Sequence, residues 1–142
     1  MRLRKNAKVE LIKGVPLFSQ LGRGELDEVA SIADEIDLSE GKELTVEGQP
    51  GREFFVIIEG DVAVRRGDRE INRLGAGDFF GEIALVEDRP RTATVVAQTP
   101  IRALVITDRS FRTLLERSPE IEEKVMSARA DRLGPDDDFQ EG

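Results

Sequence analysis

Thirteen consecutive residues, Gly81 to Ala93, place an acid, a turn of helix and an arginine at fixed spacing. This segment, which we call the cassette, reads Gly-Glu-Ile-Ala-Leu-Val-Glu-Asp-Arg-Pro-Arg-Thr-Ala. A helical turn that follows a glycine offers backbone N–H groups to an anion. Arg91 can donate parallel hydrogen bonds to phosphate oxygens, and Glu82 can accept hydrogen bonds from a sugar hydroxyl. The cassette therefore predicts a pocket for a cyclic phosphate.

Two residue types that dominate enzyme and metal chemistry are absent from the chain. There is no cysteine and no histidine, which excludes disulfides, iron–sulfur clusters and ordinary zinc sites. Nucleophilic catalysis would have to use Ser, Thr, Lys or a carboxylate without a histidine base, and no such arrangement is evident. We therefore expect no enzymatic activity, no metal ion and no cofactor.

Length and charge set further limits. The 142 residues suit one domain, large enough to bury about 68% of its unfolded surface. The formal net charge is −8, and such an acidic surface repels nucleic acid. No apolar run approaches the ~18 residues that a membrane span needs, and the N-terminus lacks the apolar stretch of a signal peptide. We expect a cytoplasmic protein that binds neither nucleic acid nor membranes.

The first part of the chain has the pattern of short helices. Apolar residues from Leu3 to Ile12 can share one helical face, and Gly14 ends that helix. Val15 to Phe18 is typical of a turn with apolar side chains. A second helix is expected from Glu25 to Asp34, with acids in its first turn and Gly24 as its N-cap.

Glycines then divide the chain between Ile36 and Thr107 into short segments with strand character. Glycine at two Gly-Asp pairs allows the positive φ that hairpin turns need. Many short strands at turn spacing indicate an antiparallel sandwich or a rolled barrel. The expected strands contain Phe54 to Ile58, Val62 and Val64, Ile71 and Leu74, Thr94 to Val96, and Ala103 to Ile106.

Two further helices are expected after the strands. Asp108 would cap a helix that ends before Pro119, and this proline suits the first turn of another helix that runs to Leu133. The acidic run that follows has the composition of a disordered segment. These boundaries predict one domain at residues 1–133 and a disordered acidic tail at residues 134–142.

The cassette and its surroundings resemble the cyclic nucleotide-binding domain family of catabolite activator proteins, cyclic nucleotide-dependent kinases and gated channels. The family's Phe-Gly-Glu-x-Ala-Leu is here Phe80 to Leu85, and its Arg-(Thr, Ser or Ala)-Ala is Arg91 to Ala93. The order of the glycines and the paired helices after the strands also match. The resemblance implies an α+β, mainly β fold: an antiparallel β-roll, a double-stranded jelly-roll-like barrel, flanked by N-terminal and C-terminal helices.

The resemblance also implies how the cassette would hold its ligand. Arg91 would pair with the exocyclic phosphate oxygens. Gly81 would let the backbone approach the ligand, and the amides of Ile83 and Ala84 would face the phosphate. Glu82 would accept a hydrogen bond from the ribose 2′-hydroxyl.

Simpler explanations for these residues are also open. Arg91 could form a surface ion pair with Glu87 or Asp88. Glu82 could favour the helix dipole without touching a ligand, and Gly81 could serve only a tight turn.

Thr92 and Ala93 would complete the ligand contacts of the cassette. By resemblance, Thr92 can add a phosphate contact and reach the guanine amino group of a syn base, although a β-branched strand residue facing solvent would look the same. Leu85 resembles the family's apolar relay residue, which moves when the cassette closes and lets the C-terminal helices swing. An ordinary core leucine is the alternative.

The base would rest against apolar strand residues. By resemblance these are Val62, Val64 and Leu74, all of which would also suit the core. Arg129 or Arg132 in the last helix would cover the base through cation–π stacking, or else lie on a solvated face.

Together these features predict a regulatory sensor that binds a cyclic nucleotide monophosphate, with cAMP favoured over cGMP. Closure around the ligand would be relayed to the C-terminal helices and on to an effector domain or protein that the sequence does not identify. The oligomeric state is left open. The alternative is a β-roll module that binds a protein partner and no nucleotide.

Overall fold

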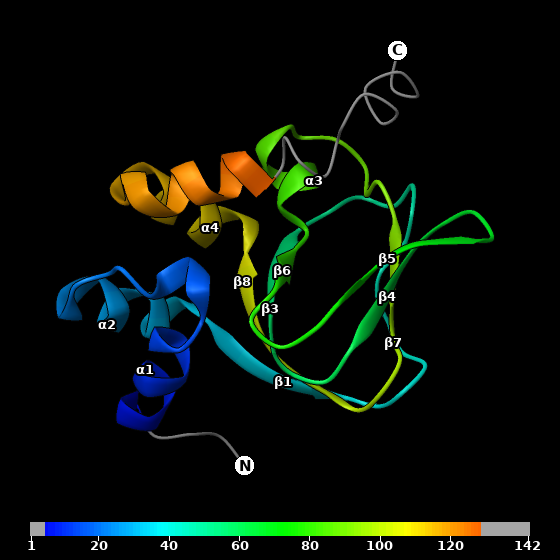
Figure 1. The fold of residues 1–142 in the computed structure, drawn as a ribbon. Coiled ribbons are helices and arrows are strands. Elements are labelled where there is room, and N and C mark those ends of the chain that lie inside the picture. The colour runs from blue at the N-terminus through cyan, green and yellow to red at the C-terminus, as the bar shows by residue number, and fades with distance from the viewer. Residues whose placement is uncertain (1–4, 129–142) are drawn as a thin grey trace.

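The computed structural model describes residues 5–128, which form two antiparallel sheets flanked by helices (Figure 1). The helices before the sheets are α1 (Lys5–Lys13), the 3-10 helix η1 (Pro16–Phe18) and α2 (Arg23–Ile32). The helices after them are α4 (Asp108–Arg117) and a helix over residues 119–128. Both groups of helices lie on the same side of the sheets in Figure 1.

The strands form a roll of two four-stranded sheets, ordered β1-β8-β3-β6 and β2-β7-β4-β5. Every pairing is antiparallel. The predicted α+β, mainly β fold is confirmed, although the described strands make two open sheets and not a closed barrel. The strands are β1 (Asp34–Leu38), β2 (Glu43–Thr45), β3 (Glu53–Glu59), β4 (Val62–Arg66), β5 (Arg69–Leu74), β6 (Phe79–Phe80), β7 (Thr94–Ala97) and β8 (Ile101–Thr107).

β3 is buried on both faces, which explains its unbroken apolar sequence. Phe54 and Val56 belong to the core beneath the helices, whereas Phe55 and Ile57 belong to the core inside the roll. Successive side chains of a strand point to opposite faces, so β3 forms the wall between these two cores.

The core beneath the helices joins both ends of the described chain. Ile12 and Val29 come from the N-terminal helices, and Phe111 and Ile121 come from the C-terminal ones. Phe111 stacks on Phe54 with the ring centroids 4.4 Å apart. This apolar contact holds α4 against β3.

Two predicted helix starts differ from the structure by one or two residues. α2 begins at Arg23, and the backbone N–H of its N-cap Gly22 donates to Glu25 Oε1 at 3.3 Å. The N-cap of α4 is Thr107, whose hydroxyl accepts from the Ser110 N–H at 3.5 Å, so Asp108 is the first helical residue. In both cases the residue that caps lies before the one predicted.

Three strands of the structure were not predicted from the sequence: β1, β2 and β6. β1 has the sequence Asp-Glu-Ile-Asp-Leu, in which charged residues hide the strand pattern, and it is held by its pairing with β8. Its first residue, Asp34, was expected at the end of a helix. β2 and β6 have three and two residues, too few to show an alternation.

Several expectations lie outside the described residues. These are the start of the first helix at Leu3, the end of the last helix at Leu133 and the tail at residues 134–142. Over residues 5–128, no helix has the length and apolar character to cross a membrane.

We expect Phe111→Ala to lower the free energy of unfolding by about 3–5 kcal/mol, because it leaves a cavity between α4 and β3. Chemical denaturation would measure the loss. Glu116→Ala, on the exposed side of the same helix, should change the free energy by less than ~0.5 kcal/mol. Equal effects of the two substitutions would show that α4 is not held by its buried face.

Candidate functional site

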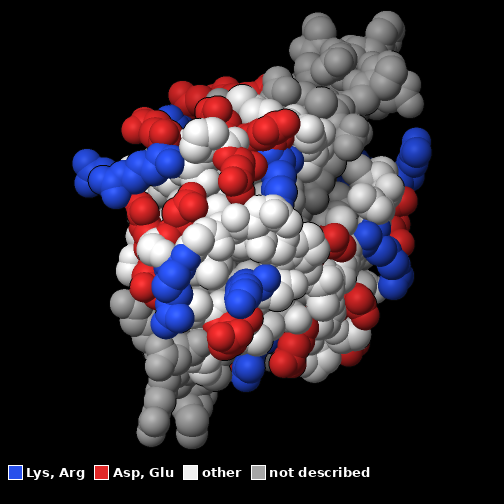
Figure 2. Space-filling view, turned by 60° about the vertical axis from the view of Figure 1, so that its left-hand side comes forward, with Lys and Arg blue, Asp and Glu red and all other residues white. Residues whose placement is uncertain are grey.

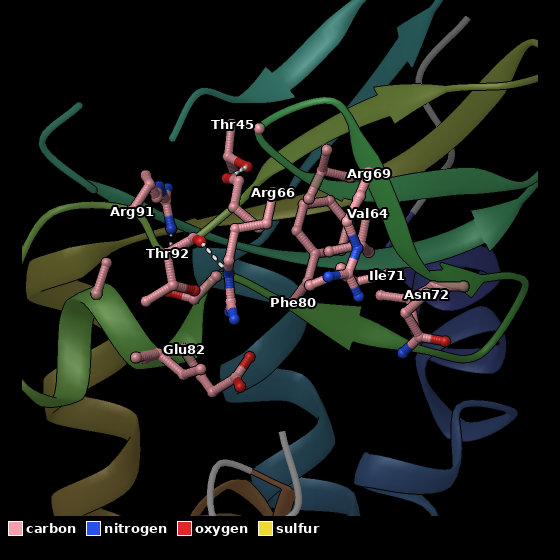
Figure 3. Close-up of a pocket in the computed structure, with 17 residues that line it drawn as sticks. Thr45, Val64, Arg66, Arg69, Ile71, Asn72, Phe80, Glu82, Arg91 and Thr92 are labelled. Carbon is pink, nitrogen blue, oxygen red and sulfur yellow. Dashed lines mark hydrogen bonds between the residues drawn. The ribbon is translucent and has the colours of Figure 1, made fainter. Parts of the chain in front are cut away.

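A cavity of about 740 Å³ lies between the β2-β7-β4-β5 sheet and α3 (Glu82–Val86) (Figure 3). It brings the cassette together with strand residues that are up to 48 positions away in the sequence. The lining residues are Thr45, Val64, Arg66, Gly67, Arg69, Ile71, Asn72, Leu74, Phe80, Gly81, Glu82, Ile83, Ala84, Arg91, Thr92, Ala93 and Val95.

The structure places most of the predicted ligand-binding residues on this wall. All of the predicted cassette contacts line the cavity: Gly81, Glu82, Ile83, Ala84, Arg91, Thr92 and Ala93. Of the predicted base contacts, Val64 and Leu74 line it, whereas Val62 is fully buried in the core inside the roll. Arg129 and Arg132 lie outside the described residues.

Arg91 is buried, with 7% of its surface exposed. Its Nη1 donates to the carbonyl oxygen of Gly81 at 3.1 Å, and its Nη2 donates to that of Glu53 at 2.8 Å. The guanidinium carbon also lies 5.9 Å from the centre of the Phe55 ring. These contacts fix the orientation of the guanidinium at the cavity wall.

The surface ion pair considered for Arg91 is not formed. Glu87 Oε1 lies 3.3 Å from Arg89 Nη1, and Asp88 Oδ1 lies 4.0 Å from Arg112 Nη2. The two acids nearest to Arg91 in the sequence therefore meet other arginines. The alternative of a surface ion pair was wrong because the Arg91 side chain turns inward.

The electrostatic environment of Arg91 contains two opposing effects. Burial lowers the pKa of Arg91 below its ordinary value, while the carboxylates of Glu53 and Glu82 raise it. Arginine is the most basic of the side chains, so the guanidinium remains charged. The site thus holds a buried positive charge.

The cavity wall is more positive than the chain as a whole. Among residues 5–128, Arg66, Arg69 and Arg91 line it together with a single carboxylate, that of Glu82, although the whole chain has a net charge of −8. On the face shown in Figure 2, by contrast, acidic and basic side chains are interspersed. Over residues 5–128, no group of three or more acidic side chains could hold a metal ion. The wall suits an anion.

Gly81 makes room for the Arg91 guanidinium. Its φ of +96° lies in the left-handed region that favours glycine. A Cβ atom there would lie 2.9 Å from both Arg91 Nη1 and the Glu53 carbonyl oxygen. A side chain at this position would push Arg91 away from its hydrogen bonds.

Gly51 makes a similar close approach to the Arg91 side chain. A Cβ atom at Gly51 would lie 2.6 Å from the Ala84 Cβ and 2.9 Å from Arg91 Nε. The loop before β3 and the turn of α3 therefore meet at the arginine with no space for a further methyl group.

The short helix α3 connects the cavity with the core beneath the helices. Glu82 is 1% exposed, and it lines the cavity together with Ile83 and Ala84. Leu85 does not line the cavity but belongs to the core beneath the helices, where it is 2% exposed. One turn of helix thus faces both the cavity and the helices.

The strand end of the cassette is held by hydrogen bonds from three other segments. The Arg91 carbonyl accepts from the Gly48 N–H at 2.9 Å. The Thr92 carbonyl accepts from Arg66 Nε at 3.0 Å, and the Ala93 carbonyl accepts from the Thr45 hydroxyl at 2.9 Å. Residues 91–93 are therefore held in place by segments that are distant in the sequence.

Sequence reasoning missed the part of the wall formed by the β4–β5 hairpin. Arg66 and Arg69 are direct partners across this hairpin, as are Val64 and Asn72. The alternation of β4 could have revealed Arg66, because residues two apart share a face with Val64. The lining residues that were not predicted as ligand contacts are Thr45, Arg66, Gly67, Arg69, Ile71, Asn72, Phe80 and Val95.

Several known proteins are similar to this chain in sequence. The model of the cyclic nucleotide-binding domain family matches residues 35–118. A cyclic nucleotide-gated potassium channel of Rhizobium etli is 37% identical over 125 residues, which are 88% of this chain and 35% of the channel. A cAMP-dependent protein kinase regulatory subunit of Mycosarcoma maydis is 34% identical over 122 residues, 79% of this chain and 23% of the subunit.

A solved structure with the same fold is the second cyclic nucleotide-binding domain of a protein kinase A regulatory subunit with bound Sp-2Cl-cAMPS. It has a TM-score of 0.73 and 26% sequence identity, and the match covers 87% of this chain and 90% of that one. The chain spans about a third or less of the length of the curated relatives. From the family match and the shared architecture, we conclude that the chain belongs to the cyclic nucleotide-binding domain family.

Proposed function

We propose that the cavity binds a cyclic nucleotide monophosphate. The observation that carries this proposal is the state of Arg91, a buried charge on the cavity wall that is hydrogen-bonded to neutral carbonyls. Among the described residues it forms no ion pair. A buried charge is costly unless it is paired, and the phosphate of a ligand would supply the missing negative charge.

The phosphate would be held by Arg91 together with the backbone of the cassette. Arginine has five N–H donors, of which two already bond to Gly81 and Glu53, so three can point to a ligand. The first amides of α3, at Ile83 and Ala84, add donors because the start of a helix leaves its N–H groups without intrahelical partners. Thr92 and Ala93 line the same end of the cavity and would complete the contact.

The ribose would be recognised by Glu82. Its carboxylate is buried at the cavity wall, in a position where it lowers the cost of burying Arg91. A carboxylate accepts hydrogen bonds and donates none when ionised. It would therefore suit a hydroxyl donor such as the ribose 2′-OH and repel the phosphate.

We propose cAMP as the favoured base form, with cGMP as the second candidate. Support comes from the kinase regulatory subunit described as cAMP-dependent and from the structure that holds a cAMP analogue. Val64 and Leu74 provide apolar surface on the cavity wall for the base, whereas Val62 lies beneath that surface in the core. Thr92 lines the wall where it could contact the guanine amino group.

The output would be a change in the packing of the C-terminal helices. Leu85 packs in the same core as Phe111 and Ile121, so a ligand that moves α3 moves a neighbour of these helices. The C-terminal helices also contact the N-terminal ones, because Lys124 Nζ donates to the Pro16 carbonyl at 2.9 Å. A ligand shifts such an equilibrium only by its differential affinity for the two states.

We propose that this domain, predicted at residues 1–133, acts as a non-enzymatic regulatory domain in the cytoplasm. The relatives include a channel and a kinase regulatory subunit, and the chain corresponds to about a third or less of each. An effector domain or protein would read the position of the C-terminal helices.

We expect Arg91→Ala to weaken cAMP binding by about ten- to a thousandfold, because hydrogen bonds to a charged group are lost. Isothermal titration of the wild type and the variant with cAMP and cGMP would measure this. Arg112→Ala, an exposed arginine 4.0 Å from Asp88, should bind like the wild type. If the wild type gave no signal with either nucleotide, the protein-interaction alternative would replace this proposal.

We expect the wild type to bind cAMP about tenfold or more tightly than 2′-deoxy-cAMP, since the deoxy analogue leaves the Glu82 carboxylate without its hydroxyl donor. In Glu82→Ala the ratio of the two dissociation constants should approach one. Competition titration with cAMP and 2′-deoxy-cAMP measures this ratio. If the substitution weakens the binding of both ligands equally, the ratio does not change. A ratio that stays at the wild-type value would remove Glu82 from the ribose site.

Gly81→Ala should weaken cAMP binding by about tenfold or more, because the added Cβ displaces Arg91. Gly41→Ala is the matched control, since Gly41 has a φ of +90° but a Cβ added there would meet no atom within 4 Å. Both variants should lose about 1–2 kcal/mol of stability through backbone strain. Equal cAMP affinities of these two variants would contradict a role of the close approach in placing Arg91.

A further inference from the structure

Arg66 is a second arginine of the cavity that neither the cassette motif nor the family match assigns. It is the last residue of β4, it is half-buried, and it lines the cavity. Figure 3 shows its guanidinium pointing into the cavity, on the side where Glu82 lies. A long cationic side chain ordinarily keeps its charged end in water, whereas this one is directed to the space that a ligand would occupy.

A hydrogen bond connects Arg66 directly to the cassette. Its Nε donates to the carbonyl oxygen of Thr92 at 3.0 Å (Figure 3), and Thr92 follows Arg91 in the chain. The guanidinium groups of Arg66 and Arg91 therefore both lie near residues 91–93 of the cassette, but different hydrogen bonds fix them. Arg91 is held through Gly81, the N-cap of α3, and through Glu53, the first residue of β3, and Arg66 reaches the cavity from β4.

The hairpin turn next to Arg66 is fixed as well. The Gly67 N–H donates to Glu47 Oε1 at 2.9 Å, and the Glu47 N–H donates to the Thr94 hydroxyl at 2.9 Å. Thr94 is the first residue of β7, directly after the cassette. Because the hairpin is held against the cassette, Arg66 loses little conformational freedom when it contacts a ligand.

The charges around Arg66 favour an anion as the ligand. Arg66 lies directly opposite Arg69 in the β4–β5 ladder, and both line the cavity. Like charges directly opposite each other in a sheet are destabilising. A negative group bound in the cavity would be attracted by both arginines. Of the pair, Arg66 is the half-buried member, whereas Arg69 is exposed.

We propose that Arg66 is a second phosphate-binding arginine, which contacts the cyclic phosphate from the β4 side while Arg91 contacts it from the α3 side. This inference rests on the proposed function, that the cavity binds a cyclic nucleotide. A cyclic phosphate has two exocyclic oxygens that are stereochemically distinct. With one arginine on each side, Arg66 and Arg91 contact different oxygens.

The test uses cAMP and its two phosphorothioates, Rp-cAMPS and Sp-cAMPS, in each of which sulfur replaces one of the exocyclic oxygens. Dissociation constants are measured with the full chain for the wild type, Arg66→Gln and Arg66→Lys. Arg73→Gln is the matched control, because Arg73 lies on β5 outside the cavity wall and pairs with Glu70 at 2.8 Å. Circular dichroism and thermal melting confirm that each variant is folded.

We expect Arg66→Gln to weaken cAMP binding by about ten- to a hundredfold and to change the Rp to Sp ratio of dissociation constants by about tenfold, since only one oxygen loses its charged partner. Arg66→Lys should keep part of the cAMP affinity, and Arg73→Gln should match the wild type in affinity and ratio. If the wild type binds but Arg66→Gln leaves the Rp to Sp ratio unchanged, Arg66 only holds the Thr92 carbonyl and this inference alone is overturned. If the wild type binds none of the three nucleotides, the proposed function is overturned and this inference with it.

Discussion

The charged Arg91 guanidinium, buried against the carbonyl oxygens of Gly81 and Glu53, is the interaction on which the rest of the site depends. Burying such a charge costs free energy, which hydrogen bonds and a bound anion reduce. Several features of the chain can be understood as conditions for it. Gly51 and Gly81 leave the space that the guanidinium needs, and residues 91–93 are fixed by hydrogen bonds from distant segments.

The same interaction connects the cavity to the helices. Glu53, which accepts from Arg91, begins β3, and β3 separates the core inside the roll from the core beneath the helices. On the other side of the arginine, Gly81 leads into α3, where Leu85 enters the helix-side core. A ligand that displaces Arg91 would therefore also displace β3 and α3, which both pack against the C-terminal helices. This physical continuity supports a regulatory role better than a cavity alone would.

The sequence predicted the cassette well because its chemistry is local: a glycine, an acid and an arginine within thirteen residues. It predicted β3 from an apolar run, since burial on both faces leaves a strong signal. It did not predict β1, whose charged residues are held by pairing with β8. It also missed Asn72, because its place on the cavity wall follows from the register of β4 with β5, which is set by tertiary structure. Arg66 was missed as well, although it shares the alternation of β4 with Val64. The inward turn of Arg91, away from Glu87 and Asp88, was one of two alternatives that residue types alone could not separate.

The most direct test of the central claim is a crystal structure of the chain with cAMP. Our account predicts the phosphate in the cavity, with an exocyclic oxygen about 2.7–2.9 Å from a guanidinium nitrogen of Arg91 and the bonds from Arg91 to Gly81 and Glu53 still in place. A nucleotide bound outside the cavity would contradict it. So would an ion pair between Arg91 and a carboxylate of the chain in place of the phosphate while the nucleotide is bound.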